Sequence, residues 1–281
     1  MSDKNFGIIL NCEKEDARSK AQEIIDHIGR RGCRVFAPPE EAVALDNVVV
    51  KEQREFNKTI DYLIIVGGDG TFLRAARFTF GYPIPIIGIN MGKLGFMTET
   101  EKEFAIEAID RILKGDYILE KRMLLFCQVI RKDDVVKEFT ALNDFVINKG
   151  AFSRLIGIHM KIDDEFYREY SSDGVIVATP TGSTAYSLSA GGPIVSPEME
   201  LSIITPICPH SLSARPMVIP PEKNVEIMVC SPRIKSMLTI DGQNGFELEN
   251  EDRITIKKSV DYLLVIKFSK QGFFSRVRDK L

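Results

Sequence analysis

A short apolar run passes directly into a glycine-rich turn at residues 64–71, and this junction constrains the fold more than any other feature. The run Ile64 to Val66 is typical of a buried strand, and Gly67-Gly68-Asp69-Gly70-Thr71 follows it. Glycines lack Cβ, so they permit a sharp turn and let a phosphate approach main-chain N–H groups. Thr71 is placed to cap the helix expected next. The Asp69 carboxylate would repel phosphate unless it meets a cation or takes a proton, which points to catalysis as well as binding.

The residues of this turn do not fit the two standard phosphate-binding motifs. The turn has no Gly-Lys-Ser/Thr ending and does not fit GxGxxG, so neither the P-loop nor the common dinucleotide-binding motif applies. An isolated GGDG is also at least as typical of a plain strand-to-helix turn in which Asp69 bonds local backbone. The rest of the chain has to decide between these alternatives.

The first 115 residues or so alternate short apolar runs with helical spacing. Alternation of this kind predicts a parallel sheet covered by helices on both faces, with ligands at the carboxyl ends of its strands. The loops at 67–71 and 90–96 would both lie at these carboxyl ends. The expected strands are 6–10, 33–36, 62–66 and 86–90. The expected helices are 17–28, a helix that contains Leu73 and Ala76, and 104–112. Gly32 is expected to be the C-terminal cap of the first helix.

After Gly115 the pattern changes to successive β-rich runs. Turn signals at Asp133-Asp134, Asp163-Asp164 and Asp241-Gly242 predict antiparallel hairpins. We therefore expect an α/β N-terminal domain at 1–118 and a β-rich C-terminal domain at 119–261. Residues 262–281 are expected to form a strand and a short helix that pack back on the first domain. The expected β-runs are 124–130, 135–142, 145–148, 155–162, 165–170 and 175–178.

Composition excludes several classes of protein. The 281 residues are 44% hydrophobic, and 37 basic residues nearly balance 40 acidic ones, so nothing indicates a nucleic-acid partner. No apolar span approaches membrane length. The five cysteines are scattered without a CxxC pair, which argues against disulfides or a zinc site and favours the cytoplasm. His27, His159 and His210 lack metal-ligand spacing.

A long segment rich in hydroxyls and glycine, Asp173 to Pro193, carries the second candidate site. A strand ending in such a segment brings main-chain groups close to a flat polar ligand, while hydroxyls bond ribose, base or amide edges and Tyr186 offers a stacking face. Helix capping by the hydroxyls and core packing of Tyr186 are the plainer alternatives. The segment contains no Gly-x-Ser-x-Gly, so a hydrolase nucleophile is not supported.

The third candidate is Asn143-Asp144, between apolar Leu142 and Phe145 in what is predicted to be continuous strand. Both residue types are depleted from strand interiors, so the pair indicates either a turn or a polar ligand contact. Arg74, Phe96, Arg154 and Gln243, which lies beside the Asp241-Gly242 turn, are weaker candidates. The ordinary roles would be a surface position for Arg74 and Arg154 and core packing for Phe96.

Five motifs in this order closely resemble the ATP-dependent NAD kinase family over nearly the whole chain. They are Gly67 to Thr71, Asn143-Asp144, the Asp173 to Pro193 block, Pro209 to Pro216 and Asp241-Gly242-Gln243. The GGDG loop alone is shared with phosphofructokinases and diacylglycerol-type lipid kinases, and the long hydroxyl-rich block discriminates. The resemblance implies a two-domain fold with the active site between the domains. It also implies transfer of the ATP γ-phosphoryl group to the 2′-hydroxyl of the adenosine ribose of NAD, giving NADP and ADP.

The resemblance also implies roles for individual residues. Asp69 matches the catalytic carboxylate, and Gly67, Gly68, Gly70 and Thr71 form the ATP phosphate loop. Many family members have Glu where this chain has Asp144, whose shorter side chain keeps the charge and changes the reach. Residues aligned with NAD-contacting positions are Asp69, Gly70, Arg74, Phe96, Asn143, Asp144, Arg154, Ser171, Asp173, Thr184, Ala185, Tyr186, Ser187, Leu188, Ser189 and Gln243.

The implied cofactor is Mg²⁺ or another divalent metal that enters with ATP, and no protein metal ligands are predicted. The implied partners are NAD and ATP, without nucleic acid or membrane, in a homodimer or homotetramer. A lipid kinase sharing the GGDG loop and a non-catalytic dinucleotide sensor are the alternatives. The first lacks a basic amphipathic membrane helix in this sequence, and the second is disfavoured because Asp69 is present.

Overall fold

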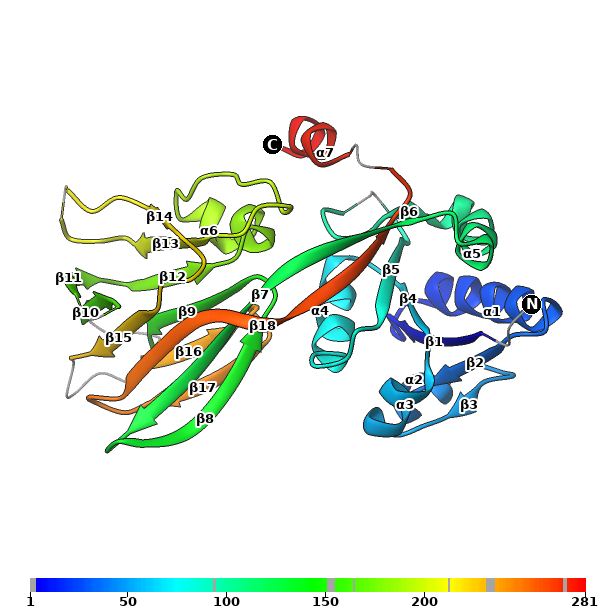
Figure 1. Ribbon diagram of the computed structural model, residues 1–281, viewed down its shortest axis with the longest axis horizontal. Coiled ribbons are helices and arrows are strands. Elements are labelled where there is room, and N and C mark those ends of the chain that lie inside the picture. Colours follow the sequence, from blue (N-terminus) through cyan, green and yellow to red (C-terminus); the bar gives the residue numbers. More distant parts are fainter. Residues whose placement is uncertain are drawn as a thin grey trace. The chain divides into compact units, whose positions relative to one another are not determined.

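A computed structural model describes residues 4–92, 95–150, 155–163, 165–211, 213–230, 236–269 and 272–281 (Figure 1). The chain divides into two compact units, Met1–Lys121 with Leu263–Leu281, and Arg122–Tyr262. These bounds lie close to the expected division at 118 and 262. No helix in the described part of the chain has the length and apolar character needed to span a bilayer.

The first unit is built on a parallel sheet. Its strands are β1 (Asn5–Leu10), β2 (Arg34–Ala37), β3 (Val49–Val50), β4 (Tyr62–Val66), β5 (Pro85–Asn90) and the end of β18 (Arg253–Lys267). They pair in the order β3-β2-β1-β4-β5-β18, and every neighbouring pair is parallel. Because the chain winds outward in both directions from β1 and β4, the strand order reverses between these two strands. Ligands bind at such a point in open α/β sheets.

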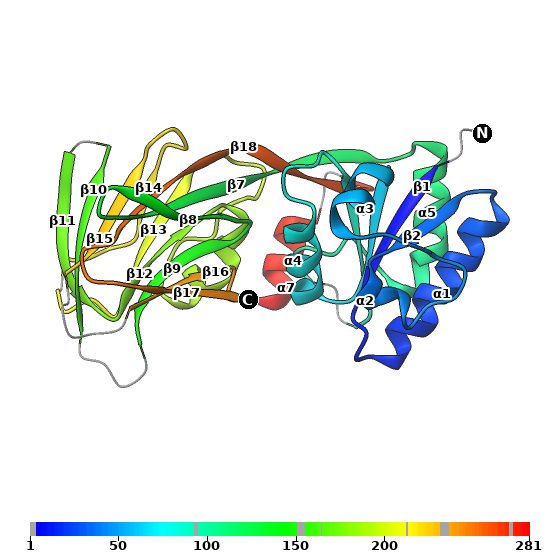
Figure 2. The same ribbon diagram turned by 90° about the horizontal axis from the view of Figure 1, so that it is seen from below.

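Helices cover both faces of this sheet, as the alternating pattern predicts (Figure 2). The apolar residues of α1 (Glu15–Arg30) and α5 (Ala105–Lys114) form one core with the sheet. On the other face, α3 (Gln53–Thr59) inserts Phe56 against Gly7, and α4 (Asp69–Phe78) inserts Phe72 against Gly88. Gly32 follows α1 with φ +76°, and the N–H of Cys33 donates to the carbonyl of Ile28. The predicted glycine at the C-terminal end of this helix is therefore confirmed. The remaining elements are α2 (Pro39–Ala42), β6 (Thr100–Glu101), η1 (Lys102–Phe104) and α7 (Phe273–Lys280).

The second unit consists of two sheets that share one core. One sheet joins β8 (Asp134–Ala141), β7 (Ile118–Arg131), β18, β15 (Val225–Val229), β10 (Ile156–Ile162) and β11 (Glu165–Ser172). The other is antiparallel, in the order β14 (Met217–Ile219), β13 (Ser202–Ile207), β12 (Gly174–Ala178), β9 (Asp144–Lys149), β16 (Ser236–Ile240) and β17 (Asn244–Leu248).

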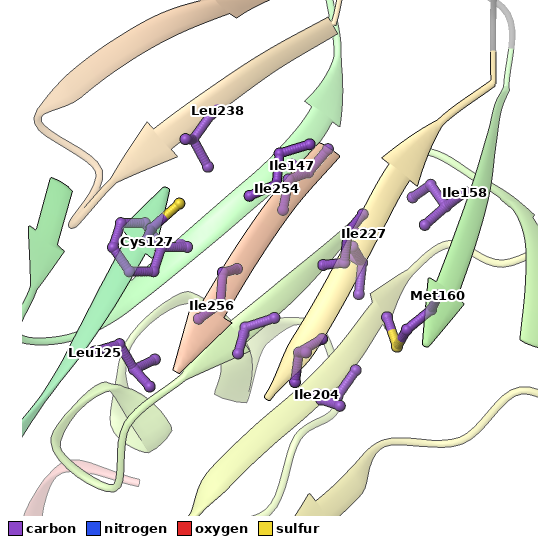
Figure 3. Packing of buried hydrophobic residues seen from close by; sticks show 14 of the residues in the cluster. Leu125, Cys127, Ile147, Ile158, Met160, Ile204, Ile227, Leu238, Ile254 and Ile256 are labelled. Atoms are coloured by element: carbon purple, nitrogen blue, oxygen red, sulfur yellow. The ribbon is translucent and has the colours of Figure 1, made fainter. Parts of the chain in front are cut away.

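Alternate residues of both sheets point into the shared core. Ile147 and Leu238 of the second sheet pack with Leu125, Ile227 and Ile254 of the first, and all are nearly or fully buried (Figure 3). Burial alternates along β15 and β16, as the period of two in a strand requires. The outer face of the second sheet is covered around Val195 and Leu201. The short elements η2 (Thr181–Thr184) and α6 (Tyr186–Ser189) follow β12.

Two local predictions need correction. The turn between β7 and β8 is formed by Lys132 and Asp133, with φ of 50° and 69°, and Asp134 already belongs to β8. The strand predicted to run through Asn143-Asp144 is interrupted, since β8 ends at Ala141 and β9 begins at Asp144. The backbone between them bonds a side chain from a distant turn instead of a neighbouring strand, as described below.

Candidate active site

The glycine loop lies at the point where the strand order of the first unit reverses. Strand β4 ends at Val66 and α4 begins at Asp69, with Gly68 as its N-cap. A Cβ on Gly67 would lie 2.5 Å from Thr71 Oγ1, so this position requires glycine. The prediction that Thr71 caps α4 is wrong, because the N-cap position has no side-chain cap bond and Thr71 lies inside the first turn. The helix therefore presents the positive end of its dipole beside the glycines, as a phosphate site needs.

The carboxylate of Asp69 is held by a second loop. Oδ2 accepts the N–H of Phe96 at 2.9 Å, and Oδ1 accepts the N–H of Met97 at 3.2 Å. Gly95 packs so closely that a Cβ there would lie 2.0 Å from Oδ1. Two adjacent strands, β4 and β5, thus bring the loops at 67–71 and 95–97 together, as expected at the carboxyl ends of parallel strands.

Two buried polar residues, missed in the sequence, fix this second loop. Asn90 at the end of β5 donates from Nδ2 to Thr98 Oγ1 at 3.0 Å and accepts the N–H of Gly92 at 2.8 Å. Thr98, fully buried, also accepts the N–H of Gly95 at 2.9 Å. An amide side chain at the end of an apolar strand is the one signal that could have identified Asn90.

Arg74 lies one turn into α4 and has two partners within the first unit. It donates from Nη1 to Glu41 Oε1 at 2.7 Å and from Nη2 to the carbonyl of Leu10 at 2.8 Å. Glu41 is 1% exposed, so this pair compensates a buried charge. The Arg74 side chain keeps 44% of its surface exposed, which leaves part of it available to a ligand. Nothing in the sequence around Glu41 signals this role.

Phe96 is half-buried, and its ring lies next to the C-terminal helix. Lys280 Nζ stands 5.3 Å from the ring centroid, within cation–π range. The ring at this predicted NAD-contacting position therefore contacts a lysine here.

In the second unit, antiparallel register brings three distant motifs to one edge of a sheet. Asp144 begins β9 opposite Ala178, which ends β12, and Phe145 lies opposite Ile240, which ends β16. The start of β9 and the ends of its two neighbours therefore coincide. This register therefore places Asn143-Asp144, the segment after β12 and the Asp241 turn at the same edge of the sheet.

Asp241 fixes the backbone of this edge. Its carboxylate accepts the N–H groups of Leu142, Asn143 and Asp144 at 3.1, 2.7 and 3.2 Å, and its own N–H donates to the carbonyl of Asp144 at 3.0 Å. These bonds replace a strand ladder, which is why β8 and β9 are separate. Asp241 has φ 51°, a conformation that Asp tolerates better than most residues.

The two buried carboxyl groups at this edge have different environments. Asp144 is 3% exposed, and no described group donates a hydrogen bond to its carboxyl. Burial, and then the nearby charge of Asp241, raise the pKa of Asp144 to about 7 from an ordinary 3.8. Near neutral pH this group is therefore partly protonated, so it offers a ligand either a donor or an acceptor.

Asn143 presents a buried amide oxygen. Its Oδ1 has no hydrogen-bond partner among the described residues. Its main chain is tightly held, because its carbonyl accepts the N–H of Thr179 at 2.8 Å and a Cβ on Gly182 would lie 2.1 Å from that carbonyl oxygen. A buried acceptor without a donor is costly unless a ligand or water supplies one.

The predicted contact span Thr184 to Ser189 exposes some side chains and uses others internally. Tyr186 is 45% exposed, and Ser189 is also exposed; Thr184, Ala185 and Leu188 are half-buried. Ser187 is fully buried and shares a hydrogen bond of 2.9 Å with Thr205. Any ligand contact by Ser187 would therefore involve its main chain.

The remaining predicted residues are more dispersed. Ser171 is exposed on β11, and Gln243 is exposed in the turn after β16. Asp173 forms an ion pair of 2.6 Å with Lys149 near the other end of β9 and β12. Arg154 lies outside the described residues.

Comparison with known proteins identifies the family. The model of the ATP-NAD kinase N-terminal domain matches residues 6–117, and that of the ATP-NAD kinase C-terminal domain matches 142–268. The NAD kinase of Moorella thermoacetica is 42% identical over 99% of this chain and 89% of its own length. The NAD kinase of Caldanaerobacter subterraneus is 41% identical over 99% of both. This chain belongs to the ATP-NAD kinase family.

Solved structures of NAD kinases share its fold. Yeast NADH kinase, solved with NADH, has a TM-score of 0.91 at 28% identity, covering 99% of this chain and 87% of that one. An NAD kinase from Archaeoglobus fulgidus, solved with ATP, has a TM-score of 0.76 at 26% identity, covering 98% of both. The expected family and the two-part NAD kinase fold are thus confirmed.

Proposed function

We propose that this chain, as an ATP-dependent NAD kinase, uses Asp69 as the general base for transfer of the ATP γ-phosphoryl group to the 2′-hydroxyl of the adenosine ribose of NAD. The products are NADP and ADP. The observation that carries the proposal is the Asp69 carboxylate, fixed by two main-chain N–H groups beside the glycine loop.

The geometry of Asp69 suits a base. An ionised carboxylate has about four lone-pair positions, and the N–H groups of Phe96 and Met97 use one on each oxygen. Among the described residues no other group bonds these oxygens, so a further position on each is left for a ribose hydroxyl. Because these bonds fix the direction of the carboxylate, the orientation needed for proton transfer exists before the substrate binds.

The transfer forms a bond between the ribose 2′-oxygen and the γ-phosphorus and breaks the bond from that phosphorus to the β-γ bridging oxygen. The hydroxyl proton moves to Asp69, and ADP leaves with the bond electrons. Mg²⁺, or another divalent metal, enters with the donor as Mg-ATP and offsets its charge. We assign phosphate binding to Gly67, Gly68, Gly70 and Thr71 at the start of α4, where N–H groups and the helix dipole favour anions.

We assign recognition of the dinucleotide to both units. In the second unit, Asn143 Oδ1 has no donor among the described residues, and the carboxyl of the next residue, Asp144, is buried, so hydroxyl or amino groups of a ligand would satisfy them. The exposed ring of Tyr186 is suited to stacking on a base or on nicotinamide. Contacts are also assigned to the other predicted positions: Arg74, Phe96, Arg154, Ser171, Asp173, Thr184, Ala185, Ser187, Leu188, Ser189 and Gln243.

The test compares Asp69→Asn with Asp116→Asn in an assay that follows NADP formation. Asp116 is an exposed carboxylate paired with Arg111, so its variant controls for loss of one acidic group. We expect Asp69→Asn to lower kcat by about 10²–10⁴-fold, the usual contribution of a general base, with the control unchanged. Thermal melting of both variants checks that each is folded. Wild-type turnover by Asp69→Asn at saturating NAD and Mg-ATP would refute the role of Asp69.

The same assay separates the alternatives. Labelled ATP with diacylglycerol in place of NAD should give no labelled product, and labelled lipid would favour a lipid kinase. NAD binding without NADP formation in the presence of Mg-ATP would favour a dinucleotide sensor. Varying the metal at fixed ATP identifies the donor complex.

We also propose a homodimer or homotetramer that acts in the cytoplasm, in NADP biosynthesis. The five cysteines are unpaired, and Cys127 is fully buried, which suits a reducing compartment. Light scattering on the purified chain measures the oligomeric state, and a monomer at all concentrations would refute that part.

A further inference from the structure

We propose that Arg276 and Glu99 are positioning residues for the catalytic base: they dock the C-terminal helix α7 on the loop that holds Asp69. The inference rests on the proposed function, because it concerns the same carboxylate. All the residues involved lie in the first unit.

Arg276 of α7 contacts the loop at 95–97, which holds Asp69, at Phe96. Arg276 donates from Nη1 to the carbonyl oxygen of Phe96 at 3.2 Å, and the N–H of Phe96 donates to Asp69 Oδ2 at 2.9 Å. Phe96 is therefore held on both sides of its main chain. A shift of α7 would move this carbonyl and, through the same residue, a donor to the Asp69 carboxylate.

A buried ion cluster fixes Arg276 itself. Glu99 accepts a hydrogen bond from Arg276 Nη2 at 3.3 Å and from the main-chain N–H of Phe268 at 2.8 Å, and it also pairs with Lys267. The side chains of Glu99, Lys267 and Arg276 are only 8%, 10% and 11% exposed. Removing Glu99 would leave two buried cations without this counter-charge, whereas removing Arg276 would leave the Glu99–Lys267 pair but no bond from the cluster to α7.

Polar contacts, and not apolar burial, set the position of α7. None of its apolar side chains is fully buried, and Phe274 is 75% exposed. The helix is preceded by Gly272 with φ 140°, which other residues rarely adopt. Among the described residues, the polar and cation–π contacts between α7 and residues 95–99 are the Arg276 bonds and the Lys280–Phe96 contact. A helix docked this way responds strongly to loss of a single guanidinium.

The experiment uses the full chain with Arg276→Met, Arg276→Lys and the control Arg278→Met. Arg278 lies on the same helix, is 76% exposed and pairs only with its neighbour Asp279 among the described contacts. Methionine keeps the aliphatic stem and removes both guanidinium bonds. Lysine keeps the charge near Glu99 but lacks the fork that reaches two acceptors at once.

We expect Arg276→Met to lower kcat about 10–100-fold, since misplacing a reacting group by about 1 Å costs about 10²-fold. The KM for NAD should rise less than kcat falls, because Arg276 bonds the main chain of Phe96, whereas the NAD contact assigned to Phe96 is its ring. Arg276→Lys should show a smaller loss of kcat, and Arg278→Met none. All rates are measured well below the melting temperature of each variant. If Arg276→Met does not fold, the predicted loss in Arg276→Lys still tests the inference.

A double-mutant cycle decides whether Arg276 acts through Asp69. In the Asp69→Asn background, replacing Arg276 by Met or Lys should cause little further loss of kcat, because the positioned group is already absent. A purely structural role would give the full loss in both backgrounds. Additive losses, or an unchanged kcat in both Arg276 variants, would overturn the inference. Full activity in Asp69→Asn alone would instead refute the proposed base.

Discussion

Replacing Gly95 by Ala tests the proposed base without altering any group that takes part in the chemistry. Gly95 is buried against the Asp69 side chain, and a Cβ there would lie 2.0 Å from Oδ1, 2.5 Å from Cγ and 2.7 Å from Oδ2. Real Cβ atoms essentially never come within 3.0 Å of another group, so either the carboxylate or the loop must move. The alanine methyl group would therefore push the base and the loop that orients it apart.

The size of the displacement follows from the contact. Ordinary van der Waals contact begins at 3.4 Å, so the 2.0 Å separation must grow by 3.4 − 2.0, or about 1.4 Å. A movement this large breaks at least one of the bonds from Phe96 and Met97. Because a misplacement of about 1 Å costs about 10²-fold in rate, we expect kcat to fall at least 10²-fold, or about 2.7 kcal/mol of transition-state stabilisation.

The assay is steady-state NADP formation at saturating NAD and Mg-ATP, with thermal melting on the same samples. Overpacking should also lower the stability of Gly95→Ala by about 1–3 kcal/mol, so rates are compared well below its melting temperature. The control is Gly29→Ala in α1, where a Cβ meets nothing within 4 Å. We expect this control to be about 0.5–1 kcal/mol more stable, with unchanged turnover. Gly95→Ala with kcat within about threefold of wild type would refute the idea that this contact orients the base.

Three further predictions concern the buried carboxyl groups of the second unit. Because burial raises the pKa of Asp144 to about 7, the folded state holds this proton more tightly than the unfolded state does. Relative to Asp144→Asn, the wild type should therefore lose roughly 4 kcal/mol of unfolding free energy as pH rises from about 4 to above 7. Urea titrations of both proteins across this range measure the effect. A difference in unfolding free energy between the two proteins that does not change with pH would contradict the prediction. Calorimetry should also show weaker NAD binding by Asp144→Ala, and unchanged affinity would count against its assigned contact. Asp241→Asn leaves one acceptor oxygen for three N–H groups, so we expect a loss of about 2–4 kcal/mol in unfolding free energy. We also expect this variant to bind NAD more weakly. The control is Asp163→Asn, at an exposed carboxylate. Equal stability of the Asp241 and Asp163 variants would show that the three bonds are dispensable.

Local sequence patterns predicted most of the elements because each element depends on its own periodicity. The buried positions of α1, the strands β1, β4 and β5 and the glycine stop at Gly32 all follow from spacing within a few residues. The hairpin turns follow from residues that tolerate positive φ, such as Asp163 and Asp241. The error of one residue in the turn before β8 is of the size expected where several polar residues are adjacent.

The interruption at Asn143 could not be predicted, because its cause is a carboxylate 98 residues away in sequence. The buried partner of Arg74 on α2 and the Thr205 partner of Ser187 are likewise contacts between distant segments. Local propensity describes the backbone preference of a residue. It does not state which distant group will satisfy a buried polar atom.

The sequence by itself determined the family, the alternation of strands and helices in the first unit, the β-rich second unit and the identity of the candidate base. Each of these is written in residue types at short spacing. Only the tertiary structure decided how that base is held: the N–H groups of Phe96 and Met97 reach Asp69 across two parallel strands, and Arg276, 180 residues from Phe96, holds the loop from the other side. The physical reason is that hydrogen bonds depend on separations of about 3 Å in space, which sequence spacing does not encode.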